Sequence, residues 1–169
     1  LWAASVGVLQ YEPIAAQPMH GESNAVVGMK EGAVFLYFAD PETGFLAAER
    51  REVEPAADAL TFYRQILEEL IRGPNSDLVR TLPPETKVRA LYRDEKGTVY
   101  ADISGSIAEG HPRGVRSELL TVYSIVNTLI LNADGVDAVK ILINGNEAET
   151  LAGHVDISLP LKAQMLLVR

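Results

Sequence analysis

The chain has 169 residues and a formal charge of −8 at pH 7, and its content of 47% hydrophobic and 22% charged residues is typical of one globular domain. Its pI near 4.9 and the lack of any Lys or Arg run exclude nucleic acid as an expected partner, because phosphates would be repelled. The sequence has no cysteine, which rules out thiol catalysis, disulfide bonds and thiolate metal ligands.

Residues 1–33 are expected to form an amino-terminal arm or linker ahead of a domain that spans 34–169. Residues 1–11, LWAASVGVLQY, carry no charge, which fits either the end of an apolar anchor or signal segment or an ordinary apolar arm. Residues 12–33 mix Pro, Gly and small residues without a period, as linkers do. Membrane attachment is therefore expected only through an anchor upstream of the sequence.

The first elements of the domain are a strand pair and a helix. VFLYF, residues 34–38, is a β-rich run, and the segment that follows the turn ADPETG continues extended, which predicts a hairpin or a bent strand pair. Pro55 is expected to open a helix that runs to Arg72, where Gly73 and Pro74 end it. The predicted apolar face of this helix consists of Ala56, Leu60, Tyr63, Leu67, Leu70 and Ile71.

A hairpin, a second helix and a closing strand pair complete the predicted elements. TKVRALYR and TVYADIS are joined by the short turn DEKG. The second helix is expected from Gly114 to Asn132, because apolar residues recur there at spacings of three and four. Its predicted stripe is Val115, Leu119, Val122, Tyr123, Val126, Leu129 and Ile130. VDAVKILING and AGHVDIS are expected to pair around the turn NGNE.

Four small hydroxyl residues form a row on the opposite face of the second helix. They are Ser117, Thr121, Ser124 and Thr128, and no charge lies between Glu118 and Asp134. A solvated face would ordinarily carry Lys and Glu, whereas small hydroxyl residues let another backbone approach closely. We expect the row either to pack inside the molecule or to be an interface with another subunit. The Arg-rich points at 49–52 and 112–116 are expected to be solvated.

The order of these motifs resembles the GerMN domain of sporulation and spore germination proteins. The resemblance covers residues 34–161 and is carried by RGPNSDLVRTLPPETKV, then VYADIS with Asp102, then IVNTL, then VKILINGNEAETLAGHVDISLPL. Its most specific pieces are Gly73-Pro74 after the first helix, Gly145, and the Gly153-His154 segment. Asp156 belongs to the same closing motif.

The resemblance implies an α+β fold like that of ring-building motifs, with two helices on one face of a small, mostly antiparallel sheet and the order β-(β)-α-β-β-α-β-β. It also implies an extracytoplasmic module, often carried by lipoproteins or membrane-anchored proteins of the bacterial envelope. No catalytic activity is attached to the family, so neither an enzyme nor a cofactor is expected. The implied partners are envelope proteins, with self-association as one form of that assembly.

His154 and Asp156 are the pair of residues with the clearest chemical potential. Spacing of two on a strand would place both side chains on one face, which permits an acid-base or metal pair. Zinc, however, usually needs three or four protein ligands, and no HExxH or similar motif supplies them. The sequence favours hydrogen bonds to nearby loop backbone, with Gly153 permitting a close backbone approach. His111 lies in a polar turn and is assigned no role.

The sequence therefore favours a noncatalytic assembly or scaffolding module at the cell envelope. The alternative is a domain that binds a small ligand or a cell-wall fragment, which would need a pocket with convergent polar groups. An envelope hydrolase has the least support, because the sequence contains no nucleophile elbow and no phosphate-binding glycine loop.

Overall fold

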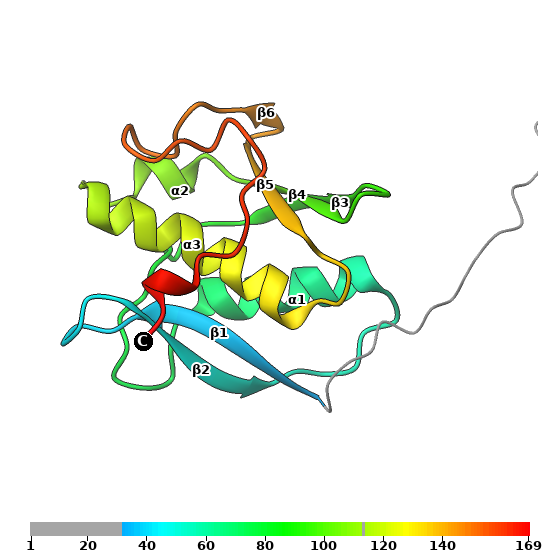
Figure 1. Ribbon diagram of the computed structural model, residues 1–169, viewed down its shortest axis with the longest axis horizontal. Coiled ribbons are helices and arrows are strands. Elements are labelled where there is room, and N and C mark those ends of the chain that lie inside the picture. Colours follow the sequence, from blue (N-terminus) through cyan, green and yellow to red (C-terminus); the bar gives the residue numbers. More distant parts are fainter. Residues whose placement is uncertain (1–31, 113) are drawn as a thin grey trace, which may run out of the picture.

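The computed structural model describes residues 32–112 and 114–169 and arranges them as two sheets with helices between them (Figure 1). The expectation for the arm falls on residues 1–31, outside this range, and stays a prediction. The two-stranded sheet contains β1 (Ala33–Ala39) and β2 (Leu46–Glu52), and the four-stranded sheet contains, in order, β3 (Val88–Arg93), β4 (Thr98–Ile103), β5 (Ala138–Ile143) and β6 (Asn146–Glu147). The helices are α1 (Ala59–Arg72), α2 (Ser106–Glu109), α3 (Val115–Asn132) and the 3-10 turn η1 (Met165–Leu167).

The mixed α+β class is confirmed, with α1 and α3 packed on one face of the four-stranded sheet. β1 lies against the same two helices from the other side, so the helices form a middle layer. This second sheet makes three layers where the sequence predicted two, and a short α2 is added to the expected order. Fully buried side chains from every layer meet in one core, including Phe38 of β1, Tyr63 of α1, Ile125 of α3 and Val99 of β4.

The four-stranded sheet is mixed rather than purely antiparallel. β3 and β4 form the predicted hairpin, and β5 and β6 are also antiparallel. β5 runs parallel to β4, in register from Thr98 opposite Ala138 to Ile103 opposite Ile143. Parallel neighbours need a crossover connection, which α2 and α3 supply across the face of the sheet.

α1 begins at Ala59, four residues after Pro55, where the sequence predicted its start. Asp58 is the N-cap, and its carboxylate accepts a hydrogen bond of 2.9 Å from the N–H of Thr61. The predicted end is confirmed, because Gly73 follows Arg72 with φ 97° and donates its N–H to the carbonyl of Leu70. The bounds of α3 are confirmed within one residue.

Two expectations about buried faces were wrong in part. Leu60 of α1 is 40% exposed, whereas Phe62 and Ile66 are buried in its place. Val115, the first residue of the predicted stripe, is 60% exposed, because it lies in the first turn of α3. The helices touch a sheet on each side, so the buried part of each helix is wider than one amphipathic stripe.

The closing strand pair was predicted wrongly. Asn144 and Gly145 both have positive φ, 52° and 80°, and turn the chain directly into β6. Two such residues form the tight hairpin turn that suits strand twist. AGHVDIS consequently lies beyond β6 as a loop, in which only Asp156 makes an isolated bridge, with Thr150.

The carboxyl-terminal segment crosses the molecule from one sheet to the other. Leu161 exchanges two backbone hydrogen bonds of 2.8 Å with Val139 of β5. Val168 then makes an isolated bridge with Leu46 of β2, and the N–H of Arg169 donates to the Leu46 carbonyl. In the part of the chain that is described, no helix is long and apolar enough to cross a membrane.

Candidate functional site

The structure separates the two residues that the sequence paired. His154 lies in the loop after β6, with its side chain 39% exposed, and its ring Nδ1 lies 2.9 Å from a carboxylate oxygen of Glu118 on α3. Asp156 is exposed and accepts a 2.8 Å hydrogen bond from the N–H of Ser158 within its own loop. The two side chains thus have different partners and do not converge on one site.

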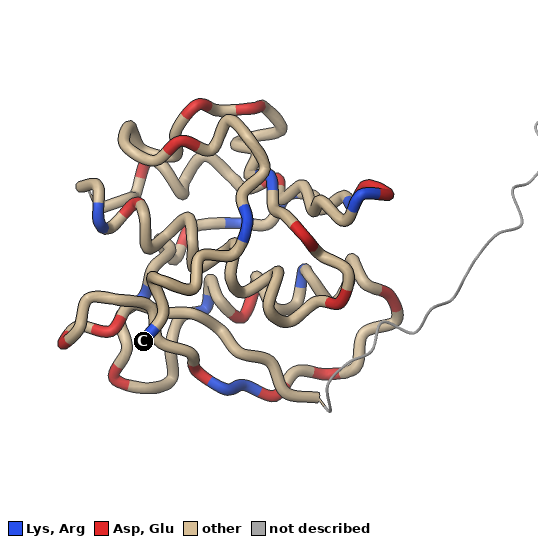
Figure 2. The backbone as a smooth tube through the Cα atoms, in the orientation of Figure 1, with Lys and Arg blue, Asp and Glu red and all other residues tan. Residues whose placement is uncertain are grey.

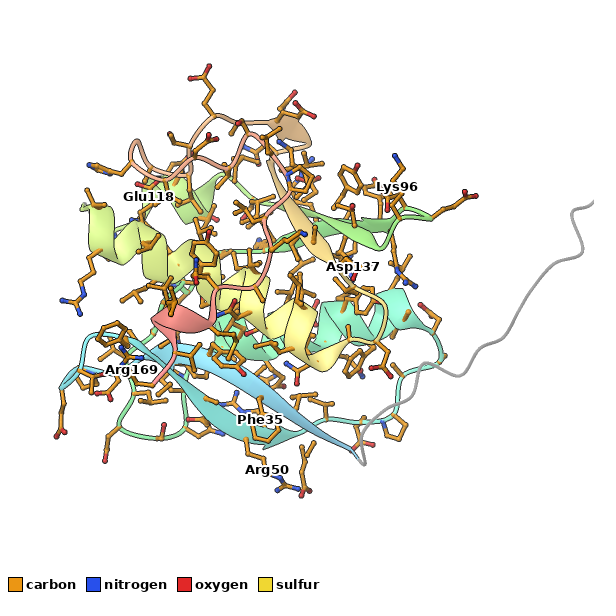
Figure 3. All side chains as sticks on the ribbon, viewed as in Figure 1. Phe35, Arg50, Lys96, Glu118, Asp137 and Arg169 are labelled. Carbon is orange, nitrogen blue, oxygen red and sulfur yellow. The ribbon has the colours of Figure 1, made fainter. Side chains whose placement is uncertain are left out.

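Glu118 is the centre of this junction, and its side chain is completely buried beneath the loop (Figure 3). One carboxylate oxygen accepts the N–H groups of Ala152 at 2.8 Å and Val155 at 3.0 Å. The other accepts the N–H of His154 at 3.0 Å as well as its ring nitrogen. A buried carboxylate with four donors is fully satisfied, and it holds the loop on the first turns of α3.

The electrostatics of Glu118 follow from this geometry. Burial alone would raise the pKa of the carboxyl, because it disfavours the charged form. The hydrogen bonds from Ala152, Val155 and His154 outweigh burial and lower the pKa of Glu118 to about 2. Glu118 is therefore ionised at neutral pH and is a poor proton donor or acceptor for chemistry near pH 7.

Gly153 shapes the loop through its backbone conformation. Its φ is 106°, a backbone angle that residues with a side chain rarely adopt, although a Cβ added there would meet no atom within 4 Å. The expected close backbone approach at Gly153 was therefore wrong. The glycine is favoured because the chain must turn so that the N–H groups on both sides of it face Glu118.

His111 is not part of the Glu118 junction. It is 7% exposed, and its ring Nε2 lies 2.8 Å from the hydroxyl of Thr121 on α3. Its Nδ1 is buried with no hydrogen-bond partner among the described residues. His111 and His154 are thus attached to different residues of α3.

The hydroxyl row of α3 is largely internal. Thr121, Ser124 and Thr128 are each at most 1% exposed, and only Ser117 retains partial exposure. The Thr81 hydroxyl donates to that of Ser124 at 2.9 Å. The Thr128 hydroxyl accepts the N–H of Tyr37 of β1 at 3.3 Å. The expected interface with another subunit is therefore corrected for Thr121, Ser124 and Thr128, which lie inside the molecule. The partly exposed Ser117 hydroxyl bonds the carbonyls of Pro112 and Gly114.

The remaining motif residues also hold loops. Asp102 accepts the N–H of Gly145 at 2.7 Å and pairs with Arg89 at 3.1 Å, which fastens the turn after β5 to the end of β4. The carbonyl of Gly73 accepts a hydrogen bond of 3.1 Å from the guanidinium of Arg51, and Pro74 follows Gly73 in the chain. Gly73, Asp102, Gly145 and His154 thus each bond a residue from another part of the domain.

Sequence reasoning missed both Glu118 and the Arg51 cluster. Basic and acidic positions lie next to one another along β2 (Figure 2). In this stretch, residues 49–52, Arg50 is exposed as expected, but Arg51 is 9% exposed and pairs with Glu49 and Glu69. Glu49 also accepts the backbone N–H groups of residues 75 and 76. The available signal was the position of Glu118, which is the last charged residue on α3 before a stretch without charged side chains that continues to Asp134.

No group of three or more His, Cys, Asp or Glu side chains in residues 32–112 and 114–169 is placed to hold a metal ion. A hollow of about 90 Å³ lies beside Phe35 and Leu131, and a larger one of about 560 Å³ is lined mainly by Glu52, Glu54, Glu68 and Glu69. Neither hollow includes His111, His154 or Asp156. The chemical role that this arrangement supports is to hold residues 152–155 in place through hydrogen bonds to Glu118.

The arrangement defines a mixed α+β domain whose buried polar groups tie loops to helices. The chain belongs to the Germane family, described as sporulation and spore germination, whose model matches residues 35–149. It is thus a GerMN domain related to sporulation and germination proteins. No curated protein gives a significant sequence match.

Three solved structures have a similar fold. The first GerMN domain of the sporulation protein GerM from Bacillus subtilis is 27% identical, with a TM-score of 0.63, covering 77% of this chain and 96% of that one. The tandem GerMN domains of the same protein are 25% identical, with a TM-score of 0.63, and the match spans 45% of that longer chain. A "Putative Lipoprotein from Clostridium perfringens" is 20% identical, with a TM-score of 0.56, covering 77% of this chain and 86% of that one.

Proposed function

We propose that this GerMN domain is a noncatalytic module for protein assembly on the extracytoplasmic side of the bacterial cell envelope. The observation that carries the proposal is the Glu118 junction. Its buried carboxylate and His154 would be the natural acid-base pair of a site, yet all the bonds of Glu118 are used to hold residues 152–155. Such a junction makes a rigid shape rather than a reactive centre.

Family membership supports the same role. GerM is described as a sporulation protein, and one chain of the same fold is described as a lipoprotein, which favours an envelope location for this domain. The family and the fold alone do not determine chemistry, so the noncatalytic role is inferred from the polar groups of Glu118 and His154, which already bond one another and the loop. Large exposed side chains remain on several faces, including Phe35 on β1, Tyr92 on β3 and Leu166 in η1.

Site-specific photo-crosslinking in the native bacterium tests this proposal. A photoreactive residue is placed in the full-length protein at Phe35, Tyr92 or Leu166, one position at a time. We expect at least one position to give a discrete crosslink to the same envelope protein in repeated experiments, while a buried position such as Ile125 gives none. No crosslink at any exposed position would contradict an assembly role.

A ligand titration separates the alternative function. Soluble cell-wall fragments added to the isotope-labelled chain are expected to leave the amide signals near His154 unchanged. Saturable shifts confined to one hollow, without any protein crosslink, would instead favour a small-ligand domain. Turnover of a cell-wall substrate that is lost in a folded Glu118→Gln protein would favour an enzyme.

A further inference from the structure

The outer edge of β3 has backbone groups that no described residue pairs. β3 is the first strand of the four-stranded sheet and has β4 on one side only (Figure 1). The N–H of Asp94 donates to the carbonyl of Thr98, so alternation places residues 92 and 90 in bonded pairs with β4. The N–H and C=O groups of Leu91 and Arg93 therefore point away from the sheet.

This edge carries positive charge in an acidic protein. Residues 87–96, KVRALYRDEK, contain four basic and two acidic residues, whereas the whole chain has a charge of −8. Arg64 of α1 reaches the same edge, where its guanidinium donates to the carbonyls of Val88 at 2.8 Å and Arg89 at 3.4 Å and lies 3.8 Å from the carboxylate of Glu68. Arg89 is half exposed and pairs with the buried Asp102 at 3.1 Å, whereas Arg93 is exposed and Lys96 lies at the tip of the hairpin (Figure 3).

An exposed aromatic side chain stands beside the unpaired backbone. Leu91 is buried toward the helices, so Tyr92, its neighbour on the strand, projects from the other face of the sheet. Tyr92 is 58% exposed and lies opposite Tyr100 of β4. Aromatic residues are favoured anchors in protein interfaces because they bury a large area with few rotatable bonds.

We propose that the β3 edge binds an extended acidic segment of a partner protein by strand addition. The N–H and C=O groups of Leu91 and Arg93 supply the backbone bonds. Acidic side chains at alternate positions of the added strand meet Arg64 and Arg93 on the side of the helices. The residues between them are apolar and pack on Tyr92. This inference depends on the proposed assembly function and names the chemistry of its partner.

The same charges argue against a second copy of this chain as the occupant. Antiparallel pairing of two β3 strands about Leu91 would bring the arginines of one copy near those of the other. Like charges across a strand pair are destabilising, and charged side chains and bulges are common protection for edge strands. β3 has a register shift between Val88 and Ala90 as well as its arginines. The arginines therefore disfavour pairing with an identical strand and favour pairing with a strand that carries acidic side chains.

A synthetic peptide is the probe for this surface. A fluorescent peptide of alternating Glu and Val, about eight residues long to match a strand, is titrated into the full-length chain. We expect saturable binding, and hydrogen exchange at the amides of Leu91 and Arg93 that slows by about tenfold or more. The matching peptide of alternating Lys and Val is expected not to bind. Two further Glu-Val peptides, methylated on alternate backbone nitrogens, should differ in affinity, because only one loses the donors that face β3.

Charge reversal at the edge is the variant test. Arg93→Glu and Arg64→Glu are each expected to weaken the Glu-Val peptide by about tenfold. Arg50→Glu is the matched control, because Arg50 is an exposed arginine on the other sheet, and affinity should be unchanged. Circular dichroism checks that each variant is folded. Equal losses in all three variants would show general charge attraction and would overturn the proposal.

The outcomes also separate this inference from the proposed function. If the peptide fails to protect Leu91 and Arg93 while crosslinks to an envelope protein persist, the β3 site is wrong and the assembly role stands. Absence of both results overturns both proposals. Concentration-dependent dimers of the unchanged protein that protect the amides of Leu91 and Arg93 would identify a second copy as the occupant and overturn the acidic partner.

Discussion

The outer edges of β1 and β3 are treated in opposite ways by the same fold. At the β1 edge, the side-chain amide of Asn132 accepts the N–H of Phe35 at 2.8 Å and donates to its carbonyl at 2.7 Å. Thr128 and Val79 bond the next groups along the strand, at Tyr37 and Ala39. At the β3 edge, Leu91 and Arg93 have no such partners among the described residues. One edge is closed by α3 together with the bridge to Val79, and the other remains available.

The difference shows what the polar face of α3 is for. A helix has no free backbone donors along its length, so side chains must act in their place when a strand edge or a loop lies against it. Asn132 and Thr128 do this for β1, and Glu118 does it for residues 152–155. We call these contacts the closed side of the molecule. Among the described residues, Arg64 alone bonds the outer backbone of the β3 edge, residues 88–93, and it does so near the start of the strand, so we call this edge the open side.

Replacement of Glu118 should damage the closed side most. Glu118→Gln keeps the shape of the side chain but removes the charge and turns an NH₂ group toward backbone donors. We expect the free energy of unfolding to fall by about 3 kcal/mol, because a buried network loses its charged acceptor. Urea denaturation of the full chain measures it. Glu147→Gln on exposed β6 is the control, and an equally small effect in both would show that the junction does not stabilise the fold.

The pH dependence of stability sharpens the same point. Glu118 has its pKa lowered from 4.5 to about 2 in the folded state, so its contribution is fully present above pH 4.5 and is lost as pH falls toward 2. That shift corresponds to about 3 kcal/mol at neutral pH. The stabilities of the original chain and Glu118→Gln should therefore converge in acid. Parallel curves down to the lowest pH would mean that Glu118 is not the titrating group.

Local patterns predicted the elements of this fold better than its junctions. The bounds of α3 and of the hairpin from β3 to β4 follow from apolar periodicity and from turn residues. Both signals come from residues that are close together in the sequence. The partners of Glu118 lie 34 to 37 residues away, so no local pattern shows them. The uncharged row on α3 indicated a packed face correctly, yet the sequence could not say that β1 and Thr81 would cover it.

The loop at 151–158 was misread for a related reason. Alternation in HVDIS has the period of a strand, and the sequence cannot tell whether an edge is free to receive it. The turn at Asn144 and Gly145 had already placed β6 on the edge of β5. Because β6 occupies that edge, residues 151–158 form a loop instead of a strand. The side chain of His154 therefore contacts Glu118 of α3 and does not share a strand face with Asp156.

Opening the closed side at Asn132 should have a moderate effect. Asn132→Leu removes both hydrogen bonds to Phe35 and should lower the free energy of unfolding by about 1 to 2 kcal/mol. Hydrogen exchange at the Phe35 amide should become about tenfold faster. Asn75→Leu changes an exposed asparagine whose side chain makes no hydrogen bond among the described residues, and it serves as control. Unchanged exchange at Phe35 would show that β1 is held by other contacts.

The smallest change is expected on the open side. Arg93→Ala should alter the free energy of unfolding by less than about 0.5 kcal/mol, since its side chain is exposed and its bond to the Gly135 carbonyl is a surface contact. In the unchanged protein, the amides of Leu91 and Arg93 should exchange rapidly, whereas Tyr92 between them, bonded to β4, should exchange slowly. Fast and slow amides alternating along one strand are the signature of an unpaired edge. Uniform protection would mean that β3 is already covered, and the contrast with β1 would then disappear because both edges would be closed.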